Sequence, residues 1–190
     1  MKILEDYIQQ HGNVPNDNVL KVDSFLNHQI DADLMMQIAK EFQEYFKDKK
    51  IDKIVTIETS GIAPSVFLGY LLKIPVVFMK KNTSRIMTDE NYHTQVHSFT
   101  KNVDYDLIVR KKFIQKDENI LFIDDFMANG EACLGAIRIL EQAQANLIGV
   151  GIVIEKSFQD GRKKIEDLGY DICSLARIQS LKDKKIEFVK

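Results

Sequence analysis

Two adjacent aspartates, Asp124 and Asp125, directly follow an apolar run, and the pair Asn129-Gly130 comes shortly after them. Carboxylates at the end of a strand can bind hydroxyl groups, or Mg²⁺ directly or through water. Asn and Gly accept the left-handed backbone of a tight turn. A helix that starts at this turn would offer free N–H groups and a positive dipole end to a phosphate. The stretch therefore suits a sugar phosphate with its metal, although helix capping alone would also explain the two acids.

A second turn of small and polar residues, Glu58-Thr59-Ser60-Gly61, follows another apolar run. Its backbone N–H groups could approach a diphosphate closely, and the hydroxyls of Thr59 and Ser60 could add hydrogen bonds. The same residues could instead cap a helix that begins near Ile62, and the two roles are compatible.

Strands and helices alternate around these two turns. The pattern of apolar residues predicts strands over residues 53–58, 76–79, 119–125 and 147–155, and helices over residues 34–46, 62–73 and 130–143. This order predicts an α/β fold with a mainly parallel sheet, right-handed crossovers and helices on both faces. Such sheets bind ligands beyond the carboxyl ends of their strands. Both turns are therefore expected at one edge of the sheet.

The composition predicts a single domain without a nucleic-acid or membrane partner. Of the 190 residues, 45% are hydrophobic and 28% are charged, and the net charge is -2. No apolar run approaches the roughly 20 residues that span a bilayer. The N-terminal stretch, with Glu5 and Asp6 inside it, lacks the features of a signal peptide. Cys133 and Cys173 are expected to be free thiols, which predicts a cytoplasmic location.

The stretch ILFIDDFMANGEA, residues 120–132, resembles the motif for 5-phosphoribosyl 1-diphosphate (PRPP) of the type I phosphoribosyltransferases. In this motif four apolar residues and two acids precede a small-residue loop that opens a helix. The resemblance implies the α/β fold of that family, with a mainly parallel sheet flanked by helices and a small base-binding hood. It implies that Asp124 and Asp125 are catalytic and face the ribose hydroxyls. It further implies that PRPP is bound by Ala128, Asn129, Gly130, Glu131 and Ala132 around the 5′-phosphate, and by Thr59, Ser60 and Gly61.

Further stretches extend the resemblance over nearly the whole chain. VLKVDSFLNHQID, VTIETSGIAPSV, HSFTK, GVGIVIEKSFQDGR and SLARIQSL are similar to the xanthine-specific branch of the family. This branch implies transfer of the 5-phosphoribosyl group from PRPP to N9 of xanthine, giving XMP and pyrophosphate in purine salvage. It also implies a homodimer, a hood from about residues 15–30 and 156–190, and xanthine contacts at Leu20, Asn27 and Lys156.

The phosphate loop departs from two other branches of the family. Hypoxanthine-guanine enzymes usually carry an acid at the position of Ala128. Compared with the A-T-G-G-T loop of adenine enzymes, Asn129 and Glu131 replace a threonine and a glycine, and Ala132 lacks a hydroxyl. One hydrogen-bonding group can decide the base, so guanine, hypoxanthine and adenine are alternative substrates. A PRPP-sensing regulator without catalysis is less favoured, because residues 1–50 are too short for a DNA-binding domain plus a hood.

Without the resemblance, the predicted base-binding residues have simpler explanations. Asn27 is typical of a turn, and Lys156 is typical of a solvated lysine that closes a strand. As ligands, the Asn27 amide offers a donor and an acceptor to a dioxopurine, and the Lys156 ammonium favours a purine oxygen. Phe158 is a candidate either for stacking on the purine or for the core.

The polar residues 81–101 predict a long loop or an irregular hairpin, which would act as a flexible lid. Closing over the pyrophosphate would exclude water, whereas the alternative is an ordinary solvated loop. The cations in or beside this segment are Lys80, Lys81, Arg85 and Lys101. His93 and His97 lack a third metal ligand in the sequence. The resemblance implies that Mg²⁺ arrives with PRPP, with no ligand directly from the protein, and that water can link it to Asp124 and Asp125.

Overall fold

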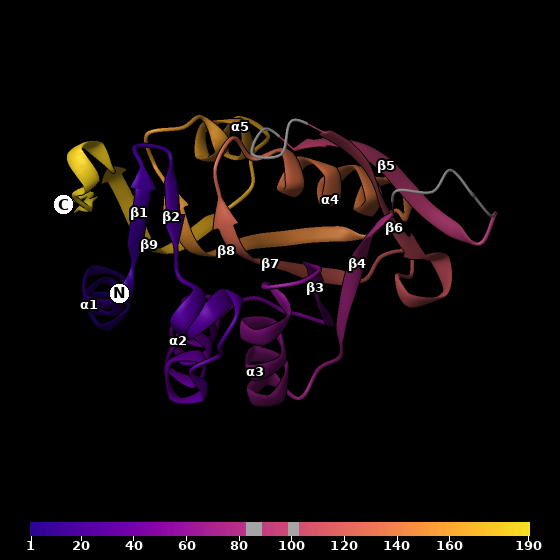
Figure 1. Cartoon of the computed structure of the whole chain (residues 1–190). Coiled ribbons are helices and arrows are strands. Elements are labelled where there is room, and N and C mark those ends of the chain that lie inside the picture. The colour runs from indigo at the N-terminus through magenta and orange to yellow at the C-terminus, as the bar shows by residue number, and fades with distance from the viewer. Residues whose placement is uncertain (83–88, 99–102) are drawn as a thin grey trace.

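The computed structural model describes residues 1–82, 89–98 and 103–190, and one sheet of eight strands runs through this part of the chain. The strands are β3 (Lys53–Ile57), β4 (Val76–Asn82), β5 (Asn91–Ser98), β6 (Val103–Arg110), β7 (Asn119–Met127), β8 (Asn146–Lys156), β9 (Ile172–Ser180) and β10 (Glu187–Phe188). Their order across the sheet is β10-β9-β8-β7-β3-β4-β6-β5 (Figure 1).

The centre of the sheet is parallel and its two sides are antiparallel. Neighbouring strands from β9 to β4 all run in the same direction. The pairs β4–β6, β6–β5 and β9–β10 are antiparallel. Every residue of β3 is buried, as expected of a strand covered on both faces. The predicted mainly parallel α/β sheet is confirmed.

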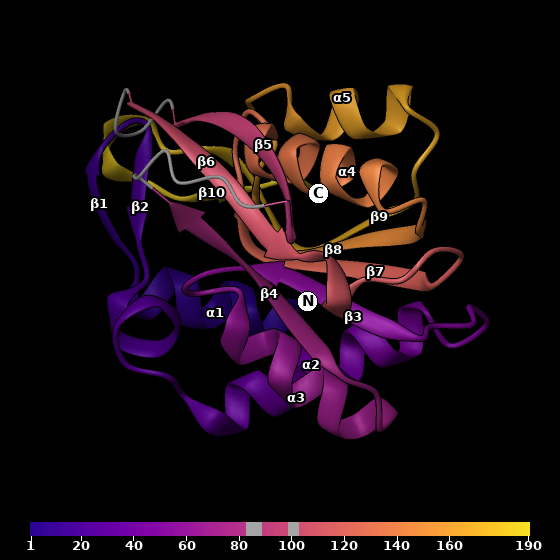
Figure 2. The ribbon, with the colours of Figure 1, turned by 90° about the vertical axis from the view of Figure 1, so that its right-hand side faces the viewer.

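Helices cover both faces of the sheet, as the sequence predicts (Figures 1 and 2). One face carries α1 (Lys2–His11), α2 (Ala32–Tyr45) and α3 (Ile62–Leu72), and the other carries α4 (Glu131–Gln142) and α5 (Gly161–Asp167). The carboxylate of Asp31 accepts the N–H of Leu34 at 2.9 Å and so caps α2. This cap satisfies one of the N–H groups that have no partner inside the helix.

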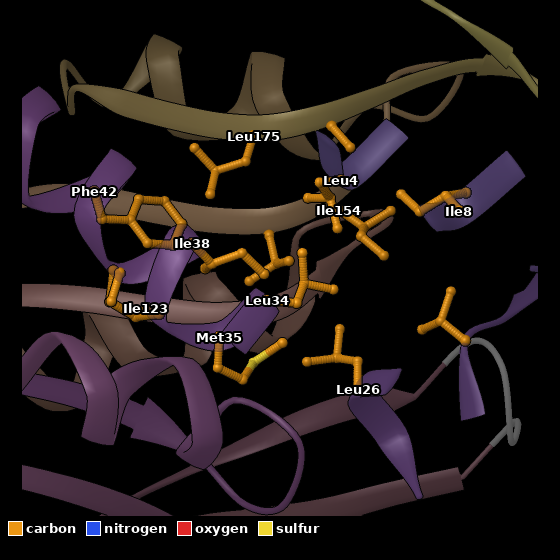
Figure 3. Close-up of a cluster of buried hydrophobic side chains, with 14 of the residues drawn as sticks. Leu4, Ile8, Leu26, Leu34, Met35, Ile38, Phe42, Ile123, Ile154 and Leu175 are labelled. Carbon is orange, nitrogen blue, oxygen red and sulfur yellow. The ribbon is translucent and has the colours of Figure 1, made fainter. Parts of the chain in front are cut away.

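Two hydrophobic clusters, one on each face, hold the helices on the sheet. In Figure 3, Ile38 and Phe42 of α2 gather with Ile123 of β7 and Leu175 of β9 in the first cluster. Phe122, the neighbour of Ile123, belongs to the second cluster beneath α4. Successive side chains of a strand point to opposite faces, so β7 contributes to both clusters and is firmly positioned.

A two-stranded hairpin stands beside the C-terminal part of the sheet (Figure 1). It consists of β1 (Asn13–Asn16) and β2 (Val19–Lys21), and the short helical segment η1 (Asp23–Asn27) follows it. β1 lies against η3 (Lys182–Lys184). The expected hood residues 15–30 include most of this hairpin and η1, whereas 156–190 contain η3 but also α5 and the main-sheet strands β9 and β10, so the hood stays a prediction.

Three strands extend farther than the sequence predicts, and β4 is one of them, since it continues past residue 79 to Asn82. β7 continues to Met127, so Asp124 and Asp125 lie inside the strand and not at its exit. β8 includes Lys156, which pairs with Ile178 of β9. The physical reason is the length of β8, which offers partners to Phe126 and Met127 beyond the acid pair.

The polar segment 81–101 contains a regular strand. Residues of β5 pair with β6 in a continuous antiparallel ladder, and Val96 is buried beneath α4. Residues 91–98 therefore form one strand of a hairpin, which was one of the two alternatives from the sequence, and not a long structureless loop. His97 Nδ1 lies 2.7 Å from the Asp104 carboxylate across the ladder. Arg85 and Lys101, two cations of the expected lid, lie outside the described residues. No helix of the described ranges is long and apolar enough to cross a membrane.

Candidate active site

Three neighbouring strands end at the segments that the sequence singles out. β3 leads into residues 59–61, β7 leads into the loop 128–132, and β8 ends at Lys156. Because β8, β7 and β3 are adjacent and parallel, their carboxyl ends lie side by side at one edge of the sheet. α3 leaves β3 toward one face and α4 leaves β7 toward the other (Figure 1). Open α/β sheets bind ligands where neighbouring connections diverge in this way.

Gly61 and Asp124 bring the first two strand ends into contact. A Cβ atom at position 61 would lie 2.9 Å from Oδ1 of Asp124 and 2.2 Å from Oγ1 of Thr56. Only glycine allows this approach, because any side chain would displace the turn or the carboxylate. Thr56 is fully buried, and its hydroxyl has no hydrogen-bond partner in the described part of the chain. The turn 59–61 and the acid pair therefore form one continuous site.

The start of the expected lid is attached to the same turn. The backbone N–H of Lys81, near the end of β4, donates to the Glu58 carboxylate at 2.7 Å. The peptide bond between Glu58 and Thr59 is cis. Lys81 is close enough to Asp124 for its positive charge to favour ionisation of that carboxyl group. One of the predicted lid cations thus contributes to the electrostatics of the acid pair.

Asp124 is buried, with 7% of its surface exposed, whereas Asp125 is half-buried. Burial raises the pKa of Asp124 well above its usual range, and the neighbouring Asp125 charge adds to the effect. The backbone N–H of Asp125 donates to Asp124 Oδ1 at 3.0 Å. A buried carboxylate gains strongly from additional donors or a cation. The site is therefore suited to bind hydroxyl groups or a metal-bearing ligand.

The loop 128–132 has the conformation of an anion site. Gly130 adopts φ +83°, in the left-handed region, and no side chain of the described residues caps the start of α4. The first N–H groups of α4 therefore remain available to an external acceptor, in contrast to the capped start of α2. A Cβ atom at position 130 would lie 3.0 Å from Cα of Gly161. Gly130 is required both for the turn and for this close approach.

α5 is hydrogen-bonded to the loop 128–132, which the sequence did not indicate. The backbone N–H of Gly161 donates to the carbonyl of Ala128 at 3.1 Å. Lys164 Nζ donates to the carbonyl of Asn129 at 2.9 Å and to Glu131 Oε1 at 2.8 Å. No local pattern marks a lysine more than thirty residues away as a partner of this loop; only a contact between distant segments does.

Lys156 lies beside the N-terminal hairpin. Its Nζ donates to the carbonyl of Asn18 at 2.7 Å and lies 5.9 Å from the ring centroid of Phe126. Burial lowers the pKa of the ammonium group. The hairpin therefore contacts the end of β8 through Asn18, and Leu20, two residues farther along, is buried in the hydrophobic core.

The remaining predicted base ligand, Asn27, is exposed at the end of η1. Its backbone N–H donates to the carbonyl of Val22, which closes the short helical turn. Phe158 has 38% of its surface exposed and therefore does not belong to the core. The roles of both side chains in base binding stay predictions.

A buried ionic network adjoins Lys156 and was not predicted. Glu155 has 1% of its side chain exposed, and its carboxylate accepts both Nε and Nη2 of Arg162, the latter at 2.8 Å. The hydroxyls of Ser157 and Ser174 donate to it as well, and Arg177 is 3.4 Å away. These bonds fix the end of β8 against α5 and β9, and thereby the backbone that carries Lys156.

The chemistry of the acid pair fits Mg²⁺. Asp124 and Asp125 offer hard oxygen ligands of the kind that Mg²⁺ prefers. Within the described ranges, no three His, Cys, Asp or Glu side chains are grouped closely enough to hold a metal ion. A divalent ion at this position would need further oxygens from its ligand or from water.

The fold and the site agree with the similarity of this chain to known proteins. The phosphoribosyl transferase domain family matches residues 21–183. The chain therefore belongs to the phosphoribosyltransferase family. The fold is shared with crystal structures of adenine phosphoribosyltransferases: that of Thermoanaerobacter pseudethanolicus has a TM-score of 0.75 at 20% identity, covering 92% of this chain and 99% of that one. For the enzyme of Giardia lamblia the TM-score is 0.76 at 18% identity, covering 92% and 97%.

Within this family the chain groups with the xanthine phosphoribosyltransferases. It is 55% identical to xanthine phosphoribosyltransferase 1 of Clostridium botulinum over 190 residues, which cover 100% of both chains. It is 53% identical to xanthine phosphoribosyltransferase of Listeria innocua, covering 100% of this chain and 99% of that one. The resemblance noted from the sequence is confirmed over the full length.

Proposed function

We propose that the protein transfers the 5-phosphoribosyl group from PRPP to N9 of xanthine, giving XMP and pyrophosphate. The observation that carries this proposal is the arrangement of three adjacent strand ends. They bring together the turn 59–61, the acid pair with the loop 128–132, and Lys156. Identity of 55% over the full length of a xanthine phosphoribosyltransferase supports the same reaction, which belongs to purine salvage.

PRPP carries a 5′-phosphate, ribose hydroxyls and a diphosphate, and each has a counterpart in the site. The uncapped start of α4 with the loop 128–132 suits the 5′-phosphate. The carboxylates of Asp124 and Asp125 suit the ribose hydroxyls as acceptors. The turn 59–61 approaches Asp124 closely and suits the diphosphate through its backbone N–H groups and hydroxyls.

The reaction breaks the bond between C1′ and the diphosphate oxygen and forms the bond between C1′ and N9, with release of one proton. Positive charge develops on the ribose ring as the leaving group departs. The carboxylates of Asp124 and Asp125, held on the rigid β7 strand, stabilise this charge electrostatically. Positioning and charge stabilisation therefore account for the catalysis, and no covalent intermediate is needed.

Lys156 is the proposed selectivity element for the base. Its ammonium group lies at the end of β8, close to the ring of Phe126 and to the hairpin that carries Leu20. A cation there favours the oxygen-rich edge of xanthine over the amino group of adenine. Asn27 is proposed to complete the recognition of the base edge through its amide.

Mg²⁺ is the proposed cofactor, and it would bind together with PRPP. The carboxylates of Asp124 and Asp125 would help to hold the ion, through water or directly, once PRPP has brought it to the site. When bound, the ion neutralises charge on the leaving pyrophosphate. The chain itself would hold Asp124 and Asp125 where their carboxylates can bind that ion, either directly or through water.

The protein is further proposed to be a cytoplasmic homodimer. Both cysteines are free and buried, which fits a reducing compartment. Val66 and Tyr70, four residues apart on α3, have 50% and 65% of their surfaces exposed, and Phe78 of β4 has 42%. Large apolar side chains that share an exposed face favour contact with a second chain. Sedimentation at the mass of two chains is expected; the mass of one chain would contradict the dimer.

The direct test is release of pyrophosphate from PRPP and Mg²⁺ with xanthine, guanine, hypoxanthine, adenine and orotate offered separately. The proposal predicts turnover with xanthine at the highest kcat/KM, and formation of XMP. Preference for another base would retain the PRPP site and discard the role of Lys156. Binding of PRPP without turnover of any base would indicate a regulator.

A further inference from the structure

Lys164 of α5 makes two contacts with the loop 128–132. Its Nζ donates to the carbonyl of Asn129 at 2.9 Å and to Glu131 Oε1 at 2.8 Å. The Lys164 side chain is 38% exposed and that of Glu131 is 26% exposed, so the pair is partly shielded from water. Its neighbour Lys163 points elsewhere, because it pairs with Asp167 and is 74% exposed.

Glu131 places a negative charge beside the proposed phosphate site, and Lys164 neutralises it. Glu131 is the first residue of α4, next to the N–H groups that suit a phosphate. An unpaired carboxylate there would repel a phosphate dianion and would compete with it for the helix N-terminus. The ammonium group of Lys164 pairs with this carboxylate and cancels its charge at the place where the ligand binds.

The contact with Asn129 also sets the orientation of one peptide unit. Cis peptides among the described residues are confined to the bond between Glu58 and Thr59, so the Asn129–Gly130 peptide is trans. In a trans peptide the C=O and the N–H point in opposite directions. Since the Asn129 carbonyl faces Lys164, the Gly130 N–H points to the opposite side of the loop. The hydrogen bond from the Gly161 N–H to the Ala128 carbonyl also joins α5 to the loop 128–132.

We propose that Lys164 is a positioning residue for the 5′-phosphate loop, which neutralises Glu131 and holds the Asn129–Gly130 peptide in its binding orientation. This inference rests on the proposed binding of PRPP at that loop. It predicts that Lys164 affects ligands with a 5′-phosphate and leaves binding of the purine base unchanged.

The test compares Lys164→Gln with the matched control Lys163→Gln in the full-length protein. For Lys164→Gln we expect KM for PRPP and the dissociation constant of ribose 5-phosphate to rise about tenfold. KM for xanthine should stay the same. Lys163→Gln should resemble the wild type in all three constants, and Lys164→Arg should retain most of the affinity. Unchanged PRPP and ribose 5-phosphate constants in Lys164→Gln would overturn the inference.

A second variant separates charge compensation from simple support of the loop. If Lys164 cancels the charge of Glu131, then adding Glu131→Gln to Lys164→Gln should recover part of the lost affinity for ribose 5-phosphate. Equal loss in the single and double variants would refute charge compensation. A wild-type protein that binds PRPP and forms no XMP would instead contradict the proposed function, so the two failures are distinguishable.

Discussion

Gly61 and Asp124 belong to different strand ends, yet a Cβ atom on Gly61 would lie only 2.9 Å from the Asp124 carboxylate. This contact exists because β3 and β7 are adjacent and parallel, so that their carboxyl ends meet. It joins the proposed diphosphate turn to the proposed ribose site. The acid pair is therefore held in a crowded, largely buried position, which has consequences for both activity and stability.

Asp124→Asn and Asp125→Asn are each expected to lower kcat/KM for xanthine and PRPP by about a hundredfold or more. Each substitution removes a negative charge that would stabilise the transition state, while the shape of the side chain is retained. Steady-state kinetics with pyrophosphate release would measure the effect. The exposed Asp48→Asn serves as a control and should not change kcat/KM.

Asp124→Asn is also expected to raise the stability of the ligand-free protein at neutral pH. Burial raises the pKa of Asp124, so the folded state binds a proton more tightly than the unfolded state does. The resulting loss of stability begins as pH rises through the carboxyl pKa of the unfolded chain, about 3.9. It is complete above the raised folded pKa. Thermal unfolding without Mg²⁺ should give a higher Tm for the variant at pH 7, and a lower Tm there would contradict this prediction.

Gly130→Ala and Gly169→Ala form a matched pair that isolates the crowding of the phosphate loop. Both glycines have φ +83°, so each substitution should cost about 1 kcal/mol or more of stability. A Cβ at position 130 meets the backbone of Gly161, whereas no atom of residues 1–82, 89–98 or 103–190 lies within 4 Å of one at position 169. KM for PRPP should rise about tenfold or more in Gly130→Ala alone. A similar KM for PRPP in both variants would argue against the loop as the phosphate site.

Lys156→Met is expected to raise KM for xanthine about tenfold or more while KM for PRPP stays the same. Because burial lowers the pKa of Lys156, the wild type should begin to lose its cation below the usual lysine pKa of about 10.4. As pH rises through the lowered pKa, KM for xanthine should therefore rise more steeply in the wild type than in the variant. Parallel pH profiles would contradict a charged contact, and the exposed Lys163→Met is the control.

Glu155→Gln is expected to destabilise the protein by about 3 kcal/mol, because Arg162 would lose its buried carboxylate. Burial disfavours ionisation of Glu155, but hydrogen bonds from Arg162, Ser157 and Ser174 outweigh it and lower the pKa. The stabilisation is therefore present above the unfolded pKa and is lost as pH falls through the lowered folded pKa. Urea unfolding at pH 7 and pH 4 would measure it.

Glu166→Gln provides the control for the ionic network. Glu166 pairs with the same Arg162 at 2.9 Å, but its side chain is 51% exposed. Its loss should change the free energy of unfolding by about 0.5 kcal/mol or less. Equal effects of Glu155→Gln and Glu166→Gln on the free energy of unfolding would show that burial does not increase the contribution of Glu155 to stability.

The sequence predicts the alternation of strands and helices because each central element carries its own periodic signal. Residues 120–123 are all apolar and residues 147–155 form a nearly continuous apolar run, as buried parallel strands require. Asp124-Asp125 and Asn129-Gly130 are close in sequence, so their local chemistry can also be interpreted without coordinates. The predicted strand nevertheless ends too early, since only pairing with β8 extends β7 to Met127.

Contacts between distant segments could not be predicted in this way. Lys164 reaches Glu131 and Arg162 reaches Glu155 only after α5 has packed beside the strand ends. For the segment that contains β5 the sequence left a long loop and a hairpin open, because its residues are mainly polar and the strand forms by pairing with β6 and packing against α4. Such elements depend on their neighbours more than on their own composition.

The most direct test of the site is a crystal structure of the protein with XMP bound. We expect the 5′-phosphate within hydrogen-bond distance of backbone N–H groups in the loop 128–132, and the ribose hydroxyls beside Asp124 and Asp125. The purine should lie near Lys156. A nucleotide whose phosphate lies away from the start of α4, or whose base lies away from the end of β8, would contradict the proposed site.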